Sequence, residues 1–378
     1  MHSTVKKNVE NPRQRLQVLC ELIASPVTNN QLTILTAAQA NLNKTQKIST
    51  SGLEVGNYGF GDGKLFLTDK SGDLYPVIGD IPVLIFPERI VRAGSAETID
   101  LRSPQYHEAY TEMKHYNKEG RSATDAIDDK TMTRYMAGAA HPNACDCPFP
   151  RPAEVWIDAL HDSVSQFEAY DYLAPLQGKR FLQLGGSGTH AIKALVGGTE
   201  LAVLLTPMLQ EAEYAKALAQ RLGVAEKFYC LIAVGEELPF NGASFDSIYS
   251  GGCLHHMRTE MAFAEMHRVL KPGGRFSCVD PWKTLLHKIG TRIFGKREAG
   301  VFCRPIDPQR LAPISIFKNH RVTRHGPILR YVFLALEKFG LKLTPKTMML
   351  VTNIDDRIGA IFGLTKTLGG SIVICGEK

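Results

Sequence analysis

Short apolar runs alternate with helical stretches from Lys179 onward, and this alternation constrains the fold more than any other feature of the chain. Helix patterns connect five strand-like runs, which are Phe181–Leu184, Leu201–Leu205, Phe228–Val234, Ser247–Ser250 and Phe276–Asp280. Strands joined by helices in this way form a mostly parallel sheet with helices on both faces. The sequence therefore predicts an α/β fold built on a doubly wound sheet.

A glycine-rich turn, Gly185-Gly186-Ser187-Gly188, follows the first of these runs and precedes a helix pattern. Such a turn lets backbone N–H groups approach a ligand closely at the start of a helix. A glycine turn that only packs a helix against a strand would have a similar sequence. The order of the motifs that follow decides between these two interpretations.

Four motifs follow in a fixed order: Glu-Glu-Leu-Pro-Phe at 236–240, Ser-Phe-Asp at 244–246, Leu-His-His-Met at 254–257 and Arg-Val-Leu-Lys-Pro-Gly-Gly at 268–274. This succession resembles the class I methyltransferases of the type 11 kind, which include the quinone C-methyltransferases. The resemblance covers about Lys179–Pro281, with a final strand expected at Ser371–Cys375. It implies a seven-stranded doubly wound sheet and S-adenosylmethionine as the cofactor.

The resemblance also implies which residues contact the cofactor at the carboxyl ends of the strands. These are Gln183, Gly185, Gly186, Gly188, Thr206, Glu236, Glu237, Leu238, Ser250 and Gly251. Three acidic residues typical of the family are replaced here, by Gln183, Leu204 and Val234. Because hydrogen bonds to carboxylates are strong, their loss leaves weakened cofactor binding and a non-catalytic methyltransferase-like scaffold as open alternatives.

Three residues are candidates for catalysis. His255 and His256 follow the fourth predicted strand, where the pocket should open, and one of them could act as general base. A structural role for both is the alternative. Asp280, at the end of the fifth strand, could orient the methyl acceptor or serve a turn.

Between residues 282 and 340 the chain departs from the family pattern, and we interpret this segment as an insertion that caps the acceptor site. Eleven Lys or Arg against two acidic residues lie between Lys283 and Arg330, which suggests an anionic acceptor. The expected substrate residues are Trp282, Arg304, Arg324 and His325. An apolar stripe over Trp282–Phe294 predicts a core-packed lid helix or, alternatively, peripheral contact with a membrane.

The N-terminal part divides into a flexible tail at 1–15, a small β-rich domain at 16–90 and a linker with some helix at 91–153, before a methyltransferase domain at 154–378. The β-rich domain resembles the zinc-ribbon activator proteins of tRNA and protein methyltransferases. Its four ligand positions hold Ser25, Thr28, Thr68 and Ser71 instead of cysteine. Since neutral hydroxyls are poor zinc ligands, no metal is predicted.

Composition adds only broad limits. Hydrophobic residues make up 44% of the 378 residues and charged residues 22%, with no apolar run long enough to span a bilayer. The polar start of the chain lacks a secretory signal, and the eight scattered cysteines suit reduced thiols, so we expect a cytoplasmic protein.

The function expected is methyl transfer to a small or medium-sized metabolite, and the basic segment suggests an anionic one. An RNA or protein methyltransferase is the alternative. No stable nucleic-acid partner is expected, because aromatic residues do not interleave the basic segment.

Overall fold

The structure is a computed structural model of the whole chain, and it describes residues 11–26, 28–36, 38–39, 65–84, 89–92, 98–100, 108, 111–112, 115, 127, 160–294, 301–340 and 343–378. Most of the predicted linker at 91–153 therefore lies outside the described residues. Residues 154–159 of the expected methyltransferase domain also lie outside the described residues.

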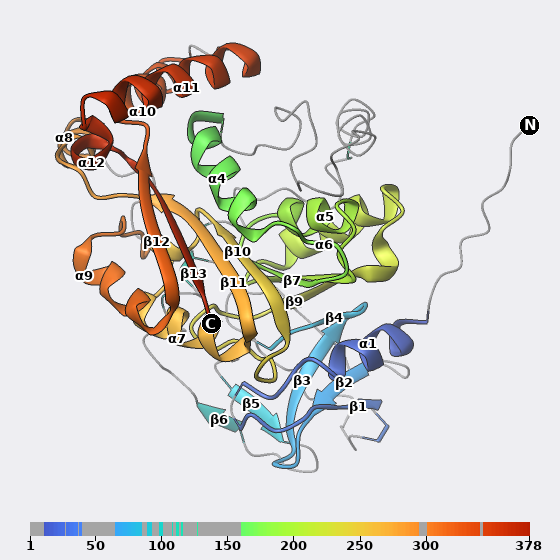
Figure 1. Cartoon of the computed structure of the whole chain (residues 1–378). Coiled ribbons are helices and arrows are strands. Elements are labelled where there is room, and N and C mark those ends of the chain that lie inside the picture. The colour runs from blue at the N-terminus through green and yellow to red at the C-terminus, as the bar shows by residue number, and fades with distance from the viewer. Residues whose placement is uncertain are drawn as a thin grey trace, which may run out of the picture.

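A seven-stranded sheet forms the centre of the molecule (Figure 1). Its strands are β7 (Arg180–Leu184), β8 (Leu201–Thr206), β9 (Phe228–Ile232), β10 (Phe245–Gly251), β11 (Leu270–Pro281), β12 (Lys318–His325) and β13 (Ser371–Glu377). They lie in the order β12-β13-β11-β10-β7-β8-β9, and only β13 runs antiparallel to its neighbours. The predicted seven-stranded, doubly wound, mostly parallel sheet is thus confirmed.

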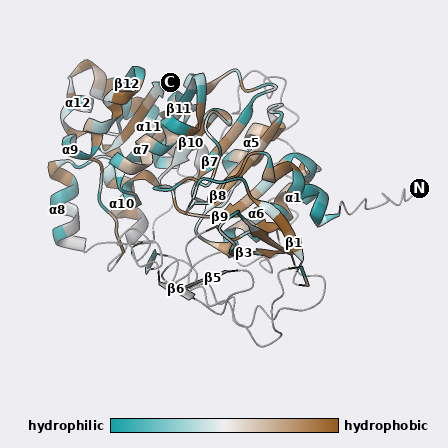
Figure 2. Ribbon diagram, turned by 90° about the horizontal axis from the view of Figure 1, so that it is seen from below, coloured by the Kyte–Doolittle hydropathy of each residue, from teal (hydrophilic) through white to brown (hydrophobic). Residues whose placement is uncertain are grey.

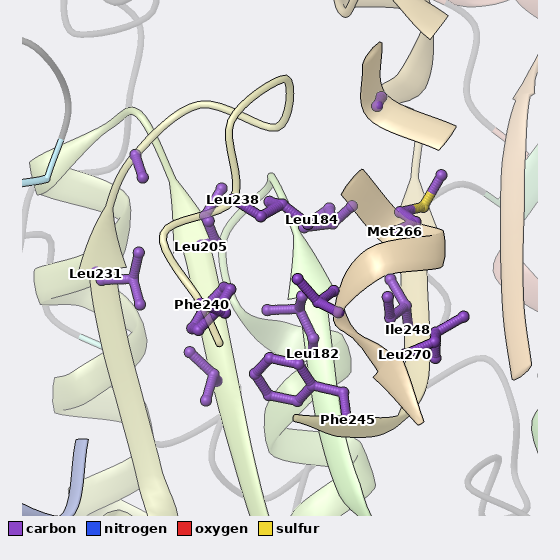
Figure 3. Packing of buried hydrophobic residues seen from close by; sticks show 14 of the residues in the cluster. Leu182, Leu184, Leu205, Leu231, Leu238, Phe240, Phe245, Ile248, Met266 and Leu270 are labelled. Atoms are coloured by element: carbon purple, nitrogen blue, oxygen red, sulfur yellow. The ribbon is translucent and has the colours of Figure 1, made fainter. Parts of the chain in front are cut away.

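Helices cover the two faces of this sheet. They are α4 (Ser163–Leu173), α5 (Thr189–Val196) and α6 (Leu209–Arg221) on one face and α7 (Thr259–Val269) on the other. The first face buries a core that includes Tyr170, Phe181 and Leu204. On the second face Leu182, Leu184, Leu205 and Leu231 project from the strands toward Met266 of α7 and the chain around Phe240 (Figure 3). Strands buried on both faces explain why the sequence shows continuous apolar runs.

The segment from 282 to 368 combines helices with one more strand of the sheet. Its helices are α8 (Leu285–Phe294), α9 (Pro308–Leu311), α10 (Leu329–Lys338), α11 (Pro345–Ile361) and α12 (Leu364–Leu368), and it contains a short 3-10 turn at Ala312–Ile316. Other 3-10 turns precede this segment, at Leu160–Asp162, Ala225–Lys227 and Leu254–His256. Figure 1 shows α8, α10, α11 and α12 gathered beside the end of β12.

The interpretation of 282–340 as a pure insertion was incomplete, because β12 belongs to the central sheet. Its charged sequence, Lys-Asn-His-Arg-Val-Thr-Arg-His, suits an exposed edge strand, and polar side chains at an edge hide the apolar alternation that signals a strand. In the part of the chain that the structure describes, no helix combines the length and apolarity that crossing a bilayer requires.

The predicted β-rich N-terminal domain is a small antiparallel sheet with one helix. Its elements are α1 (Pro12–Cys20), β1 (Thr33–Thr36), β2 (Leu65–Thr68), β3 (Asp73–Ile78), β4 (Ile81–Pro82), β5 (Arg89–Arg92) and β6 (Thr98–Asp100). The sheet order is β1-β2-β3-β5-β6, and β4 pairs with β3 across the turn at Gly79-Asp80. Helix α1 begins inside the expected flexible tail, and Figure 2 shows it as largely hydrophilic.

This N-terminal unit packs directly on the second face of the large sheet. Arg15 of α1 donates hydrogen bonds to the carboxylate of Asp80 and to the carbonyls of Ala225 and Phe228, at 2.5–2.7 Å. Val83 forms a parallel bridge to Ile232 of β9, which extends the sheet beyond its edge strand. Apolar side chains of α1, β2 and β3 join the core under α7. The small unit therefore supplies part of the cover that helices supply elsewhere in the fold.

Candidate active site

The turn that follows β7 brings the backbone of α5 close to the ends of the neighbouring strands. Gly185, Gly186 and Gly188 all have φ values between +72° and +78°, a region that favours glycine. A Cβ atom at Gly188 would lie 2.6 Å from the Cβ of Ala215. The Gly185 N–H donates to the Leu205 carbonyl at 2.7 Å, which ties the turn to β8. The glycines thus allow a close approach of backbone elements that a side chain would block.

The side chain of Gln183 stabilises this turn by hydrogen bonds. Its side-chain NH₂ donates to the Gly185 carbonyl at 2.8 Å, and its Oε1 accepts from the Ala191 N–H at 2.7 Å. The side chain is fully buried. Gln183 was expected to contact the cofactor, whereas both of its hydrogen bonds go to the turn and the first residues of α5.

A cavity that opens to solvent lies at the carboxyl ends of β7, β8, β9 and β10. Its lining residues are Glu108, Glu112, Gly185, Gly186, Leu205, Pro207, Met208, Val234, Gly235, Glu236, Cys253, His256 and Met257. The strand order reverses between β7 and β10, which is the switch point where open α/β sheets bind their ligands. The cavity therefore occupies the place where this fold holds a nucleotide-like ligand.

Four of the predicted cofactor and catalytic residues line the cavity: Gly185, Gly186, Glu236 and His256. Thr206 and Leu238 are not among the lining residues. The hydroxyl of Thr206 accepts from the Met208 N–H at 3.3 Å, and the Leu238 N–H donates to Glu265 at 2.8 Å.

The remaining predicted cofactor residues have different surroundings. Ser250 is buried, and its hydroxyl has no hydrogen-bond partner among the described residues. A Cβ atom at Gly251 would meet the ring of Tyr249 at 3.0 Å. Neither these two residues nor Gly188 and Glu237 line the cavity.

Glu236 is a buried acidic residue of the cavity. It is 7% exposed, and its Oε1 accepts from the Arg258 N–H at 2.8 Å. Burial raises the pKa of Glu236 to about 7, despite the opposing effect of that hydrogen bond. Its carboxyl group is thus poised to ionise near neutral pH.

Two further carboxylates, of Glu108 and Glu112, reach the cavity from the predicted linker, where some helix was expected but no site residue was predicted. Glu108 forms two hydrogen bonds, of 3.0 and 3.2 Å, with the Arg258 guanidinium. Glu112 lies 3.1 Å from His256 Nδ1. Their spacing of four residues places both on one helix face, and this was the signal available in the sequence.

The three catalytic candidates lie together. His255 donates its backbone N–H to Asp280 Oδ1 at 3.0 Å, and its ring Nδ1 lies 2.8 Å from the same oxygen. The rings of His255 and His256 are 4.1 Å apart between centroids. Asp280, at the end of β11, thus orients His255, while His256 lines the cavity.

The expected substrate residues lie outside the cavity lining. The Arg324 guanidinium stacks 5.0 Å from the ring centroid of Trp282, and that of Arg304 stacks 4.6 Å from the ring centroid of Phe302. His325 lies between Glu168 and Asp356, and hydrogen bonds to both carboxylates raise its pKa to about 9 against the effect of burial. In this arrangement His325 joins β12 to α4 and α11.

Comparison with known proteins agrees with this geometry. The family model described as a methyltransferase domain matches residues 182–278. This segment is similar to methyltransferase domains. It contains the glycine turn, the Glu236 motif and the two histidines, so the methyltransferase resemblance is confirmed for this part of the chain.

Two curated relatives each match about a quarter of the chain. A tRNA U34 carboxymethyltransferase of Hydrogenovibrio crunogenus is 35% identical over 107 residues, covering 27% of this chain and 32% of that protein. A ubiquinone/menaquinone biosynthesis C-methyltransferase of Rubrivivax gelatinosus is 34% identical over 108 residues, covering 28% and 41%. The chain thus spans about a third of the length of the first curated relatives it matches. Among solved structures, geranyl diphosphate C-methyltransferase of Streptomyces coelicolor aligns with a TM-score of 0.48 and 14% identity over 73% of this chain and 99% of that one.

Proposed function

We propose that this protein is an S-adenosylmethionine-dependent methyltransferase that acts on a small or medium-sized metabolite. The observation that carries the proposal is the cavity at the sheet's switch point, with the Gly185–Gly186 turn on one side and three carboxylates around it. The cofactor would supply its methyl group as a sulfonium cation. A cation in a partly desolvated cavity is stabilised by nearby carboxylates.

The carboxylates of the cavity support a substitute for the acidic residues that are replaced in this chain. Leu204 belongs to the core on the first face of the sheet, and Val234 lines the cavity without a charge. Glu108, Glu112 and Glu236 reach the same cavity from other parts of the chain. We infer that these three residues take over the role of the usual acids, which favours an active enzyme over a non-catalytic scaffold.

Calorimetric titration with S-adenosylmethionine and S-adenosylhomocysteine tests this proposal. The two ligands differ in the sulfonium charge, so the carboxylates should favour the first ligand. Replacing Glu112→Gln should weaken S-adenosylmethionine about tenfold, because a charge-assisted contact of about 1.5 kcal/mol is lost, and should weaken the neutral product less. Glu226→Gln, in the surface turn before β9, is the matched control and should change neither affinity. Binding of neither ligand at millimolar concentration would favour the scaffold alternative.

An RNA acceptor is the second candidate. One relative is named as a tRNA U34 carboxymethyltransferase, and exposed cations such as Lys288, Arg292 and Arg321 lie along α8 and β12. Such cations bind phosphates, and affinity would then fall steeply with salt. Methylation of a small-molecule pool but not of a total tRNA fraction, with no salt-sensitive tRNA binding, would support the metabolite.

We further infer that the N-terminal unit is a metal-free relative of the zinc-ribbon activators. Ser71 donates its hydroxyl and its N–H to Asp69 Oδ1 at 2.5 and 3.0 Å, and the Thr28 hydroxyl also donates to this carboxylate. Hydrogen bonds from Ser71, Thr28 and Ser25 hold the pKa of Asp69 below its ordinary value, although burial opposes them. The Asp69 carboxylate and the hydroxyls around it would thus connect the two halves of the ligand set, Ser25 with Thr28 and Thr68 with Ser71, where the related proteins use a zinc ion.

A further inference from the structure

A cluster of metal-ligating side chains adjoins the cavity at His256. One donor atom each from His255, His256 and Cys303 lie within 4.8 Å of one another. The histidines belong to the 3-10 turn after β10, whereas Cys303 comes from the segment between α8 and α9. Imidazole nitrogen and thiolate sulfur are the ligands that zinc prefers in proteins. The fold thus assembles a zinc-type ligand set from distant parts of the chain.

Both imidazole rings have a hydrogen-bond acceptor beside Nδ1. His255 Nδ1 lies 2.8 Å from Asp280 Oδ1. His256 Nδ1 lies 3.1 Å from the Phe302 carbonyl and 3.1 Å from Glu112 Oε1. An acceptor next to Nδ1 keeps the ring proton on that nitrogen, so that Nε2 carries the lone pair. Second partners of this kind, carboxylates and carbonyls, orient and tune the histidines of metal sites.

The two segments that carry the ligands are fixed to each other by Arg310 of α9. Its guanidinium donates to the carbonyls of Leu254 and Met257 at 3.2 and 2.6 Å, and also to the carbonyl of Arg304. The Arg304 N–H in turn donates to the His255 carbonyl at 3.0 Å. The backbone on both sides of the cluster is therefore braced before any ion binds. Such preorganisation lowers the cost of assembling a site.

Asp280 gives a second, independent observation at this cluster, a buried carboxylate oxygen without a hydrogen-bond partner in the described part of the chain. The residue is 2% exposed, and its Oδ1 accepts both hydrogen bonds from His255. Its Oδ2 is buried without a hydrogen-bond partner among the described residues. A buried carboxylate oxygen without a partner is costly, and a cation on the adjacent imidazole would compensate it.

We propose that His255, His256 and Cys303 bind a zinc ion, with Asp280 positioning His255. Three protein ligands leave the fourth tetrahedral position open, which is the pattern of catalytic rather than structural zinc sites. Because His256 also lines the cavity, an ion held by its ring would border the space proposed for the methyl donor. If the proposed methyltransferase function holds, the ion would bind an acceptor hydroxyl or thiol and favour its deprotonated form.

Metal binding by the full-length protein tests the site without relying on activity. The purified chain is titrated with Co²⁺, and we expect about one equivalent to bind with tetrahedral visible bands and a sulfur-to-cobalt charge-transfer band. Cys303→Ser should abolish the charge-transfer band, and Asp280→Asn should weaken cobalt affinity by about 10- to 100-fold. Cys20→Ala, in α1, and His320→Ala, in β12, are matched controls that should keep the wild-type spectrum.

The outcomes separate this proposal from the proposed function. Absence of a charge-transfer band, or a band that persists unchanged in Cys303→Ser, overturns the zinc site even if S-adenosylmethionine binds. A normal band in a protein that binds neither S-adenosylmethionine nor its product supports the metal site and refutes the methyltransferase function. Circular dichroism spectra of the variants that match the wild-type spectrum establish that a lost band reflects a lost ligand.

Discussion

Replacing Gly188 by alanine should destabilise the protein through two separable effects. The residue has φ +78°, and an L-residue in the left-handed region costs about 1–2 kcal/mol. The new Cβ would also lie 2.6 Å from the Cβ of Ala215 and 3.1 Å from Leu204 Cδ2. Such overpacking costs about 1–3 kcal/mol, so Gly188→Ala should lower the free energy of unfolding by about 2–5 kcal/mol.

Gly178→Ala is a matched control for this prediction. Gly178 has φ +68°, but a Cβ atom added there would meet no atom within 4 Å, so only the backbone cost of about 1–2 kcal/mol applies. Urea unfolding followed by circular dichroism and by tryptophan fluorescence gives both values, and the difference between the variants measures the packing cost. Equal losses of stability in the two variants would refute the claim that close packing, rather than backbone conformation, requires glycine at 188.

Three further predictions concern ionisable groups. The pKa of Glu236 is raised from 4.5 to about 7, so its ionisation lowers the free energy of unfolding by about 3 kcal/mol above pH 7. In urea titrations Glu236→Gln should therefore become more stable relative to wild type as the pH rises from 5 to 8. A stability difference between the two proteins that does not change with pH would contradict the raised pKa. The pKa of His325 is raised from 6.5 to about 9, which adds about 3 kcal/mol to the free energy of unfolding below pH 6.5, and this contribution is lost as the pH rises through 9. His325→Gln should therefore be more destabilising at pH 6 than at pH 9.5. The reverse order would refute the ion pairs of His325 with Glu168 and Asp356. Asp69→Ala leaves two hydroxyl donors without their acceptor and should cost about 2–3 kcal/mol, seen as faster proteolysis of the N-terminal unit, whereas the exposed Lys70→Ala should not; equal cleavage rates would argue against the carboxylate cluster.

The central sheet was predictable because its signals are local. Each apolar run, glycine turn and helix pattern lies within a few residues, and β8 and β10 differ from the expected runs only at their ends. Strand β11 is longer than expected, since it begins at Leu270, whereas the predicted run begins at Phe276. Strand β12 was missed because its exposed, charged residues lack the apolar alternation of a half-buried strand.

The candidate site was less predictable because it joins residues that are distant in the sequence. The motifs located Gly185, Gly186, Glu236 and His256, since the strand ends of this fold meet at one edge. No local pattern connects Glu112 or Cys303 with His256, and these contacts depend on how long segments fold back. The contact between Arg324 and Trp282 depends on the pairing of β12 with β13, and the spacing of the two residues along the chain does not predict it.

The bridge between Val83 and Ile232 has a consequence for the order in which the molecule is made. The N-terminal unit is synthesised well before β9, so the apolar surface that it packs on the large sheet stays uncovered during much of synthesis. Contacts of such large sequence separation form slowly. We therefore expect the nascent N-terminal unit to bind chaperones. We also expect an N-terminal truncation to expose the edge of β9 and to promote aggregation.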